Sequence, residues 1–394
     1  LKYATEGKQR KVWYIAPTYG MAKQIMWDAL LEVLPKPWIL RINETKMIIR
    51  LVNGSIIECK GADNPDSLRG VGLHFVVLDE FQDMKPDVWF KVIRPTLSST
   101  MGHAFFIGCV VGDTKVLSSS GFKTINSYSK KESAKTLTTI DESLYGSNRE
   151  FHKADGFWNN GVVDTVKIET KKGFQLECSL PHPILVMGDS GVPKWKATRE
   201  LKVGDRTAQA RGMEVWGNKD PLDKFQEHAI EWRKKYRKMK QFPNVKMTSD
   251  LAYLMGLWTA EGSIESDIDR VTITCGDLEI LHPYVDDGIH GFNFIWRSDI
   301  KIAVNSREFV EMMRFIGMPL VKATQKYIPD WVMQGKREWA ISFLSGMWDG
   351  DGHIDSKVHQ RAGYSSASKK LIKDAQLLLQ NIGIIARASF DHLC

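Results

Sequence analysis

The sequence has no apolar run long enough to cross a membrane and no secretory signal at its start. A bilayer-spanning helix needs roughly 18 consecutive apolar residues. The five cysteines have neither paired nor metal-ligand spacing, so we expect reduced thiols and no zinc site. These absences favour a soluble intracellular protein over a membrane protein or a disulfide-rich secreted domain.

The chain also lacks an initiating methionine, and its last residues show no helix cap, so we expect a fragment of a longer reading frame. Its 394 residues are enough for two or three domains, each with its own core. Contents of 43% hydrophobic and 26% charged residues are ordinary for a globular protein. The net charge of +7 suits a polyanionic partner, although it decides little by itself.

An α/β pattern opens the chain. Residues 12–16 form a short apolar run, and after Pro17 and Thr18 apolar residues recur at helical spacing up to residue 33. Apolar residues on both sides of Asn53 and Gly54 predict a hairpin, because this pair suits a turn that needs positive φ. A strand followed by a helix predicts a layered α/β domain.

Residues 76–78 form a second apolar run, which ends in Asp79 and Glu80. Acids at the carboxyl end of a parallel strand lie where ligands bind in α/β folds. There Asp79 would hold the Mg²⁺ of a nucleotide, and Glu80 would polarise the attacking water. The pattern alone leaves open a buried strand that simply ends in two solvated acids.

The order of short motifs up to residue 108 resembles the ATPase domain of the terminase large subunit of tailed phages. The matching segments are residues 14–19, 53–55, 61–63, 67–70, 78–80, Trp89 and residues 94–95. The resemblance implies a motor that uses ATP to drive DNA into a capsid, with Asp79 and Glu80 as the Walker B pair. It also implies the capsid portal and the small terminase subunit as partners. The phosphate loop G-x-x-x-x-G-K-[ST] does not occur here, and Cys109 stands where the coupling motif would continue.

From Cys109 the sequence changes to short alternating segments broken by turns, which predict an all-β domain. Cys109 follows Gly108, whose carbonyl has no side chain to hinder attack by a thiol. Ser179 stands three residues before His182, so its hydroxyl could polarise an amide while the imidazole protonates the departing nitrogen. Taken singly, a core cysteine and a histidine in a turn remain alternatives.

In this order, Cys109 with residues 112–114 and the pair Ser179 and His182 resemble the Hint fold of inteins. The resemblance implies that Cys109 begins a self-excising insert and that Ser179 and His182 belong to the second splicing motif. The reaction needs no cofactor. The terminal asparagine of the insert and the next nucleophile are expected after residue 394, so this chain would form a thioester at Cys109 without splicing.

Residues 251–262 and 341–352 repeat one design, an apolar helix with a central glycine that ends in an acid and a glycine. Small residues at equivalent places let two helices approach closely, which would bring Glu261 and Asp351 together. Two ordinary buried helices with acidic ends are the alternative. The basic run at residues 233–240 fits a DNA partner or simply a solvated helix face.

The duplicated pattern resembles the LAGLIDADG, or DOD-type, homing endonucleases. The resemblance implies that Glu261 and Asp351 bind Mg²⁺ and activate water against opposite strands of double-stranded DNA. Thr259 replaces the first acid of the motif, which leaves Glu261 as the only metal ligand in that copy. Residues 270–274 and 299–304 are candidate strands of a sheet whose Lys and Arg side chains follow phosphates.

The predicted architecture is multidomain. It joins a partial α/β P-loop-type ATPase (residues 1–108), the first part of an all-β Hint domain (109–215) and an α+β endonuclease (216–394). The endonuclease has pseudo-symmetric repeats near residues 250–320 and 338–394. We expect the protein in the cytoplasm of the infected cell. Two other functions stay open, a free-standing homing endonuclease in which Cys109 and His182 are inert, and a motor ATPase with an inert insert.

Overall fold

The structure is a computed structural model, which describes residues 2–5, 7–80, 84–85, 88–106, 110–128, 136–139, 150–153, 162–180, 182–188, 191–235, 245–265, 269–355 and 361–390. The chain forms two compact units. The first consists of Leu1–Val111, Asn160–Ile168 and Leu176–Ala208, and the second of Gly112–Asn159, Glu169–Gln175 and Gln209–Cys394. In the described ranges no helix is long and apolar enough to span a bilayer.

A six-stranded sheet forms the core of the first unit, in the order β2-β3-β4-β1-β5-β6. Strands β4, β1, β5 and β6 run parallel, whereas β2 and β3 are antiparallel additions at one edge. The turn between β3 and β4 contains Gly54 at a φ of 82°, as the predicted hairpin requires. The bounds are β1 Lys11–Ala16, β2 Ile39–Asn43, β3 Ile48–Leu51, β4 Ile56–Gly61, β5 Phe75–Leu78 and β6 His103–Phe106.

Apolar clusters lie on both faces of β1. Val12 and Tyr14 belong to one cluster. Trp13 and Ile15 belong to the other, which explains why the strand reads as an unbroken apolar run. The predicted helix begins after Thr18, whose side chain caps it. The helical segments are α1 Lys2–Thr5, α2 Tyr19–Ala22, the π turn Lys23–Trp27, α3 Asp28–Val33, the π turn Val88–Ile93, α4 Arg94–Ser98 and the 3₁₀ turns Lys36–Trp38 and Pro65–Leu68.

The described residues between 110 and 208 form strands and two 3₁₀ turns. One antiparallel sheet has the order β10-β9-β7-β8, and two further pairs are β11 with β12 and β13 with β14. That the whole segment is one all-β domain stays a prediction. The bounds are β7 Lys115–Ser118, β8 Gly121–Thr124, β9 Thr136–Thr139, β10 Glu150–Lys153, β11 Thr165–Glu169, β12 Gln175–Ser179, β13 Pro183–Met187 and β14 Pro193–Ala197, with 3₁₀ turns Ile125–Ser127 and Thr198–Glu200.

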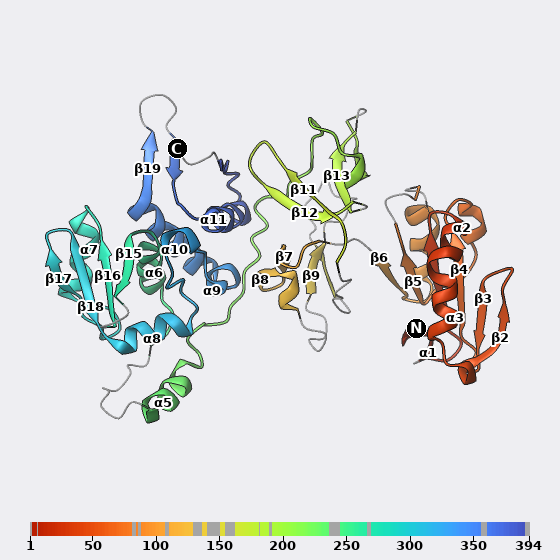
Figure 1. Cartoon of the computed structure of the whole chain (residues 1–394), viewed down its shortest axis with the longest axis horizontal. Coiled ribbons are helices and arrows are strands. Elements are labelled where there is room, and N and C mark those ends of the chain that lie inside the picture. Colours follow the sequence, from red (N-terminus) through yellow and green to blue (C-terminus); the bar gives the residue numbers. More distant parts are fainter. Residues whose placement is uncertain are drawn as a thin grey trace. The chain divides into compact units, whose positions relative to one another are not determined.

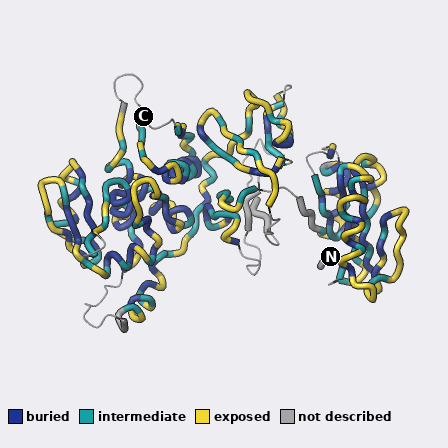
Figure 2. Tube along the Cα trace, viewed as in Figure 1, coloured by how far each residue is buried: buried dark blue, intermediate teal, exposed yellow. Residues whose placement is uncertain are grey.

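Two long helices, α6 (Ser249–Glu261) and α10 (Arg337–Asp351), lie side by side within the second unit (Figure 1). Most of α6 is buried, whereas α10 alternates between buried and more exposed positions (Figure 2); the buried side chains of both helices belong to one apolar cluster. Each is followed directly by an antiparallel hairpin, β15 with β16 after α6 and β19 with β20 after α10. This repeated order of helix and hairpin matches the repeat in the sequence.

The first repeat builds a four-stranded antiparallel sheet, β15-β16-β18-β17. Strand β16 has the predicted bounds 270–274, and β18 begins two residues later than predicted. The strands are β15 Gly262–Glu265, β16 Arg270–Thr274, β17 Ile295–Ser298, β18 Lys301–Asn305, β19 Gly352–Asp355 and β20 Arg361–Tyr364. The other helices are α5 Phe225–Lys235, α7 Leu278–Asp286, α8 Arg307–Phe315, α9 Asp330–Gln334, α11 Lys369–Asn381 and the 3₁₀ turn Ala323–Gln325.

Glycines allow the contact between α6 and α10. A Cβ atom on Gly256 would lie 2.0 Å from the carbonyl oxygen of Phe343, and one on Gly346 would lie 2.1 Å from that of Tyr253. No side chain fits at such distances, since backbone atoms cannot yield as side chains do. The predicted close approach of α6 and α10 is therefore present, and it determines the position of the two helix ends relative to each other.

Candidate functional site

The acids predicted for the nuclease lie at the last helical positions of α6 and α10. Both helices end in the same way, because the backbone N–H groups of Gly262 and Gly352 bond back to the carbonyls of Trp258 and Trp348. Glu261 and Asp351 interact: burial raises the pKa of the Glu261 carboxyl, and the negative charge of Asp351 raises it further. The structure thus brings together two acids that are far apart in the sequence.

A buried lysine stands beside these acids. The Nζ atom of Lys326 donates to the backbone carbonyls of Thr259 at 2.6 Å and Ala260 at 3.0 Å. Burial lowers the pKa of Lys326, and the charges of Asp351 and Glu261 oppose this effect. Sequence reasoning missed Lys326 as a site residue, because no local pattern around it indicates a contact with the end of α6.

One tyrosine, Tyr364, lies beside the two acids, and another, Tyr253, contacts Asp349 in the turn before Asp351. The hydroxyl of Tyr364 is buried and forms no hydrogen bond of normal geometry within the described residues. Burial and the nearby Asp351 raise the pKa of this hydroxyl. Tyr253 donates to Asp349 at 2.7 Å, whereas Thr259, at the equivalent position of the first repeat, bonds to the carbonyl of Met255 in its own helix.

The chemistry of these groups fits a hard divalent cation. Mg²⁺ prefers oxygen ligands and usually keeps several waters or substrate phosphates in its shell. A cation at Glu261 and Asp351 would relieve the repulsion that raises the pKa of Glu261. No cluster of three or more His, Cys, Asp or Glu side chains occurs in the described part of the chain. The two carboxylates would hold such a cation together with water or other oxygen ligands.

Two of the predicted splicing residues, Ser179 and His182, belong to the first unit. Cys109 is outside the described residues, but Val110 forms an antiparallel bridge with Cys178, and the N–H of Val111 donates to the carbonyl of Glu177. Ser179 is buried at the end of β12. The N–H of His182 bonds to the carbonyl of Ser179, so the two form one turn.

The ring of His182 is enclosed. Burial lowers the pKa of His182, and the Nδ1 atom of its ring has no hydrogen-bond partner in the described residues. Thr198 fixes the backbone here, because both its N–H and its hydroxyl donate to the carbonyl of His182, at 2.9 Å and 2.7 Å. A neutral imidazole with a free ring nitrogen is suited to proton transfer.

The predicted Walker B acids follow β5 at the carboxyl end of the parallel strands. The hydroxyl of Tyr14 on β1 donates a short hydrogen bond to Asp79, which together with burial raises the pKa of this tyrosine. Glu80 has a φ of 51°, an uncommon conformation for a residue with a side chain. Asp79 is therefore held at the carboxyl edge of the parallel strands.

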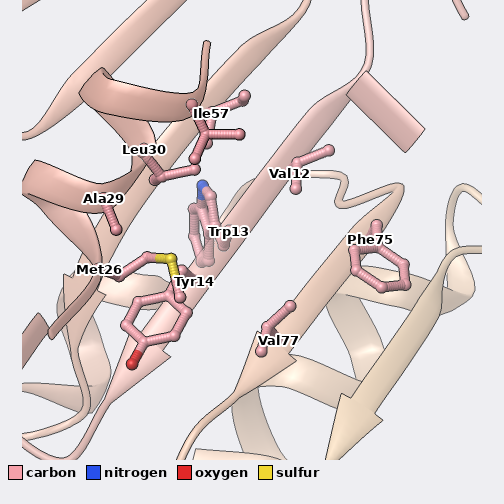
Figure 3. Close-up of a pocket in the computed structure, with 10 residues that line it drawn as sticks. Val12, Trp13, Tyr14, Met26, Ala29, Leu30, Ile57, Phe75 and Val77 are labelled. Atoms are coloured by element: carbon pink, nitrogen blue, oxygen red, sulfur yellow. The ribbon is translucent and has the colours of Figure 1, made fainter. Parts of the chain in front are cut away.

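An apolar pocket of about 260 Å³ lies between the helix and the sheet of the first unit (Figure 3). Tyr14 and Phe75 from the sheet and Met26 and Leu30 from the helix line it. No acid or base lines this pocket, so it is unsuited to hold phosphates.

Replacing Lys326 by Met should raise the pKa of Glu261 above its value in the unsubstituted protein. The ammonium group of Lys326 lowers the pKa of Glu261. Without it, burial and the charge of Asp351, which both raise this pKa, are no longer opposed. Carboxyl NMR titration of the metal-free protein measures the shift.

We also expect cleavage of DNA to slow about 100-fold, as when one preorganised donor is removed. Lys336→Met removes an exposed lysine of the same unit and should change neither quantity. An unchanged Glu261 pKa in Lys326→Met would contradict this assignment.

Comparison with known proteins supports two of the three resemblances. Residues 338–389 match the LAGLIDADG-like domain. This match includes α10, Asp351 and Tyr364. The chain is also 35% identical to the terminase large subunit of Thermus virus P23-45 over 129 residues, which make up 28% of this chain and 26% of that protein. The predicted LAGLIDADG and terminase resemblances are thereby confirmed, whereas the intein resemblance stays a prediction.

The chain is also similar to a replication factor C small subunit and to a solved terminase domain. The chain is 27% identical over 316 residues to a replication factor C small subunit of Methanocaldococcus jannaschii, covering 73% of this chain and 15% of that protein. The solved ATPase domain of the Thermus phage P74-26 large terminase is 31% identical, covers 26% of this chain and 49% of its own, and has a TM-score of 0.24. The chain thus spans only a small part of its full-length relatives.

Proposed function

We propose that the chain is part of a terminase large subunit interrupted by an intein, and that the intein carries a Mg²⁺-dependent DNA endonuclease. The convergence of Glu261 and Asp351 beside Lys326, at the ends of two helices joined through glycines, carries the nuclease proposal. The matched LAGLIDADG-like domain supports it.

Hydrolysis of DNA needs an attacking water and compensation for the charge that develops on the phosphate. Bound Mg²⁺ supplies a more acidic water and offsets phosphate charge. Glu261 and Asp351 hold the cation, one from each repeat. Lys326 is a fixed positive charge beside both acids, where it limits their repulsion before the metal and DNA arrive. Arg270 and Lys301 on the neighbouring sheet are candidates to follow the DNA backbone.

The relatives support an inserted element. The terminase alignment covers 28% of the chain and the replication factor alignment covers 73%. Residues 1–108 and 109–394 divide the chain in about the same proportion. An insertion at Cys109 would divide the chain into shares of these sizes.

The splicing step that we propose uses Cys109, Ser179 and His182. The imidazole of His182 takes the proton of the Cys109 thiol, and the sulfur attacks the carbonyl carbon of Gly108. The C–N bond between them then breaks, and the imidazole passes the same proton to the departing amine nitrogen. The bridge of Val110 to Cys178 supports this assignment. Val110 and Cys178 are the sequence neighbours of Cys109 and Ser179.

In the spliced protein, residues 1–108 would belong to an ATP-driven DNA-packaging motor. Asp79 would hold Mg²⁺ with ATP, and Glu80 would orient the attacking water. The capsid portal and the small terminase subunit would be its partners. These roles rest on the resemblance of residues 14–95 to terminases and on the similarity to the Thermus virus protein.

Incubation of the 394-residue chain with a plasmid library that carries randomised inserts tests the nuclease. With Mg²⁺ we expect a subset of inserts to be cut on both strands, and with EDTA we expect no cleavage, because the carboxylates act through the cation. Sequencing of the cut ends identifies the target. Equal cleavage in EDTA, or cleavage of no insert in Mg²⁺, would refute the proposed nuclease.

A further inference from the structure

The loop that carries Lys326 is fastened to the start of α11. The hydroxyl of Ser368, the N-cap of α11, donates to the carbonyl of Lys326 at 2.5 Å. Two residues further along the loop, the N–H of Ile328 donates to Oδ2 of Asp374 at 3.2 Å. These hydrogen bonds determine the position of the Lys326 ammonium group at the C-terminal end of α6.

Asp374 is in turn paired with a residue outside the predicted nuclease. Its Oδ1 atom lies 2.9 Å from Nζ of Lys115 in β7, and the two side chains are 4% and 12% exposed. A carboxylate buried to this degree is stable as an anion only with a charged partner. Lys115 is that partner, so it keeps Asp374 in the state that accepts the bond from Ile328.

Other contacts seat β7 and β8 on the same part of the nuclease. Phe122 in β8 is 5% exposed and belongs to the apolar cluster that includes the helices α6 and α10. Gly121 has a φ of 89°, and a Cβ atom on it would lie 2.3 Å from the carbonyl oxygen of Met333 in α9. The hairpin therefore packs against the nuclease by shape as well as by charge.

We infer that Lys115, in a strand of the predicted splicing segment, is a positioning residue of the endonuclease, acting through Asp374 and the loop that carries Lys326. The inference rests on the proposed nuclease function. It means that nuclease activity depends on residues that precede the predicted endonuclease domain by about a hundred positions in the printed sequence.

The test compares Lys115→Met with Lys115→Arg, which keeps the charge, and with Arg337→Met, which removes an exposed ion pair with Glu214 of the same 2.9 Å length. Because one buried charge left alone destabilises the fold, the double variant Lys115→Met with Asp374→Leu removes the whole pair. The readouts on the full chain are hydrogen exchange of the Ile328 amide, DNA affinity in Ca²⁺ and single-turnover cleavage in Mg²⁺.

We expect faster exchange at Ile328 and a loss of cleavage rate between about 10-fold and 100-fold in both Lys115→Met and the double variant, with DNA affinity unchanged. Lys115→Arg should restore most of the rate, and Arg337→Met should behave as the unsubstituted chain. A folded double variant that cleaves at the full rate would overturn the inference. If the unsubstituted chain cleaves no DNA, the proposed nuclease fails first, and Lys115 has no reaction to support.

Discussion

DNA cleavage should fall at least about 1,000-fold when Glu261 is replaced by Gln and Asp351 by Asn in one protein, because the bound metal supplies several kcal/mol to the reaction. The amides keep the size of the acids but neither binds Mg²⁺ as a carboxylate does. The fold should stay intact, since the substitutions remove two like charges that repel each other at the helix ends. Single-turnover cleavage of the selected DNA target measures the effect.

A matched control changes one Glu and one Asp elsewhere in the same unit. Glu279→Gln with Asp286→Asn alters two exposed acids of α7 and should leave the cleavage rate unchanged. Thermal unfolding of both proteins shows whether the fold is retained. A double variant of Glu261 and Asp351 that still cleaves near the original rate would show that the catalytic acids lie elsewhere.

The second large effect concerns Cys109. Hydroxylamine should cleave the unsubstituted chain between Gly108 and Cys109, because it intercepts the thioester that the thiol forms. Cys109→Ala removes the nucleophile, and we expect no cleavage at this bond. His182→Gln should slow cleavage by about 100-fold or more, since it removes the group that protonates the departing nitrogen. Mass spectrometry of the fragment that ends at Gly108 follows the reaction.

Cys275→Ala is the control for thiol reactivity, because Cys275 is buried in the nuclease core and burial raises the pKa of its thiol. It should cleave as the unsubstituted chain does. Hydroxylamine cleavage that persists in Cys109→Ala would eliminate the splicing proposal and leave the free-standing endonuclease. A complete precursor that hydrolyses ATP while it still contains the insert would instead favour a motor with an inert insert.

Short-range patterns predicted much of this structure. The apolar run at residues 12–16, the turn at Gly54 and the strand at residues 270–274 depend on local preferences and burial, and all three occur as expected. The pairing of α6 with α10 was predictable because a repeat in the sequence carried glycines at equivalent positions. Each of these patterns, including each copy of the repeat, is about a dozen residues long, so a single sequence is enough to find them.

The remaining features depend on contacts between distant segments. Lys326 resembles any lysine in a loop until its side chain is seen at the end of α6. Nothing near Lys115 marks it as the partner of Asp374, and nothing near Val110 marks it as the partner of Cys178. Local patterns identify which residues have suitable chemistry, whereas tertiary packing decides which of them meet.

The packing of β7 and β8 has a consequence for which mutations the proposed insert would accumulate over generations. A deletion that removed the nuclease would leave Phe122 without its apolar surroundings and Lys115 without its counter-charge, so the surviving splicing segment would be harmed. A single base change at the codon of Glu261 or Asp351 would remove the proposed DNA cleavage and leave both contacts intact. Lineages that lose the nuclease should therefore keep its length and core while its acids disappear first.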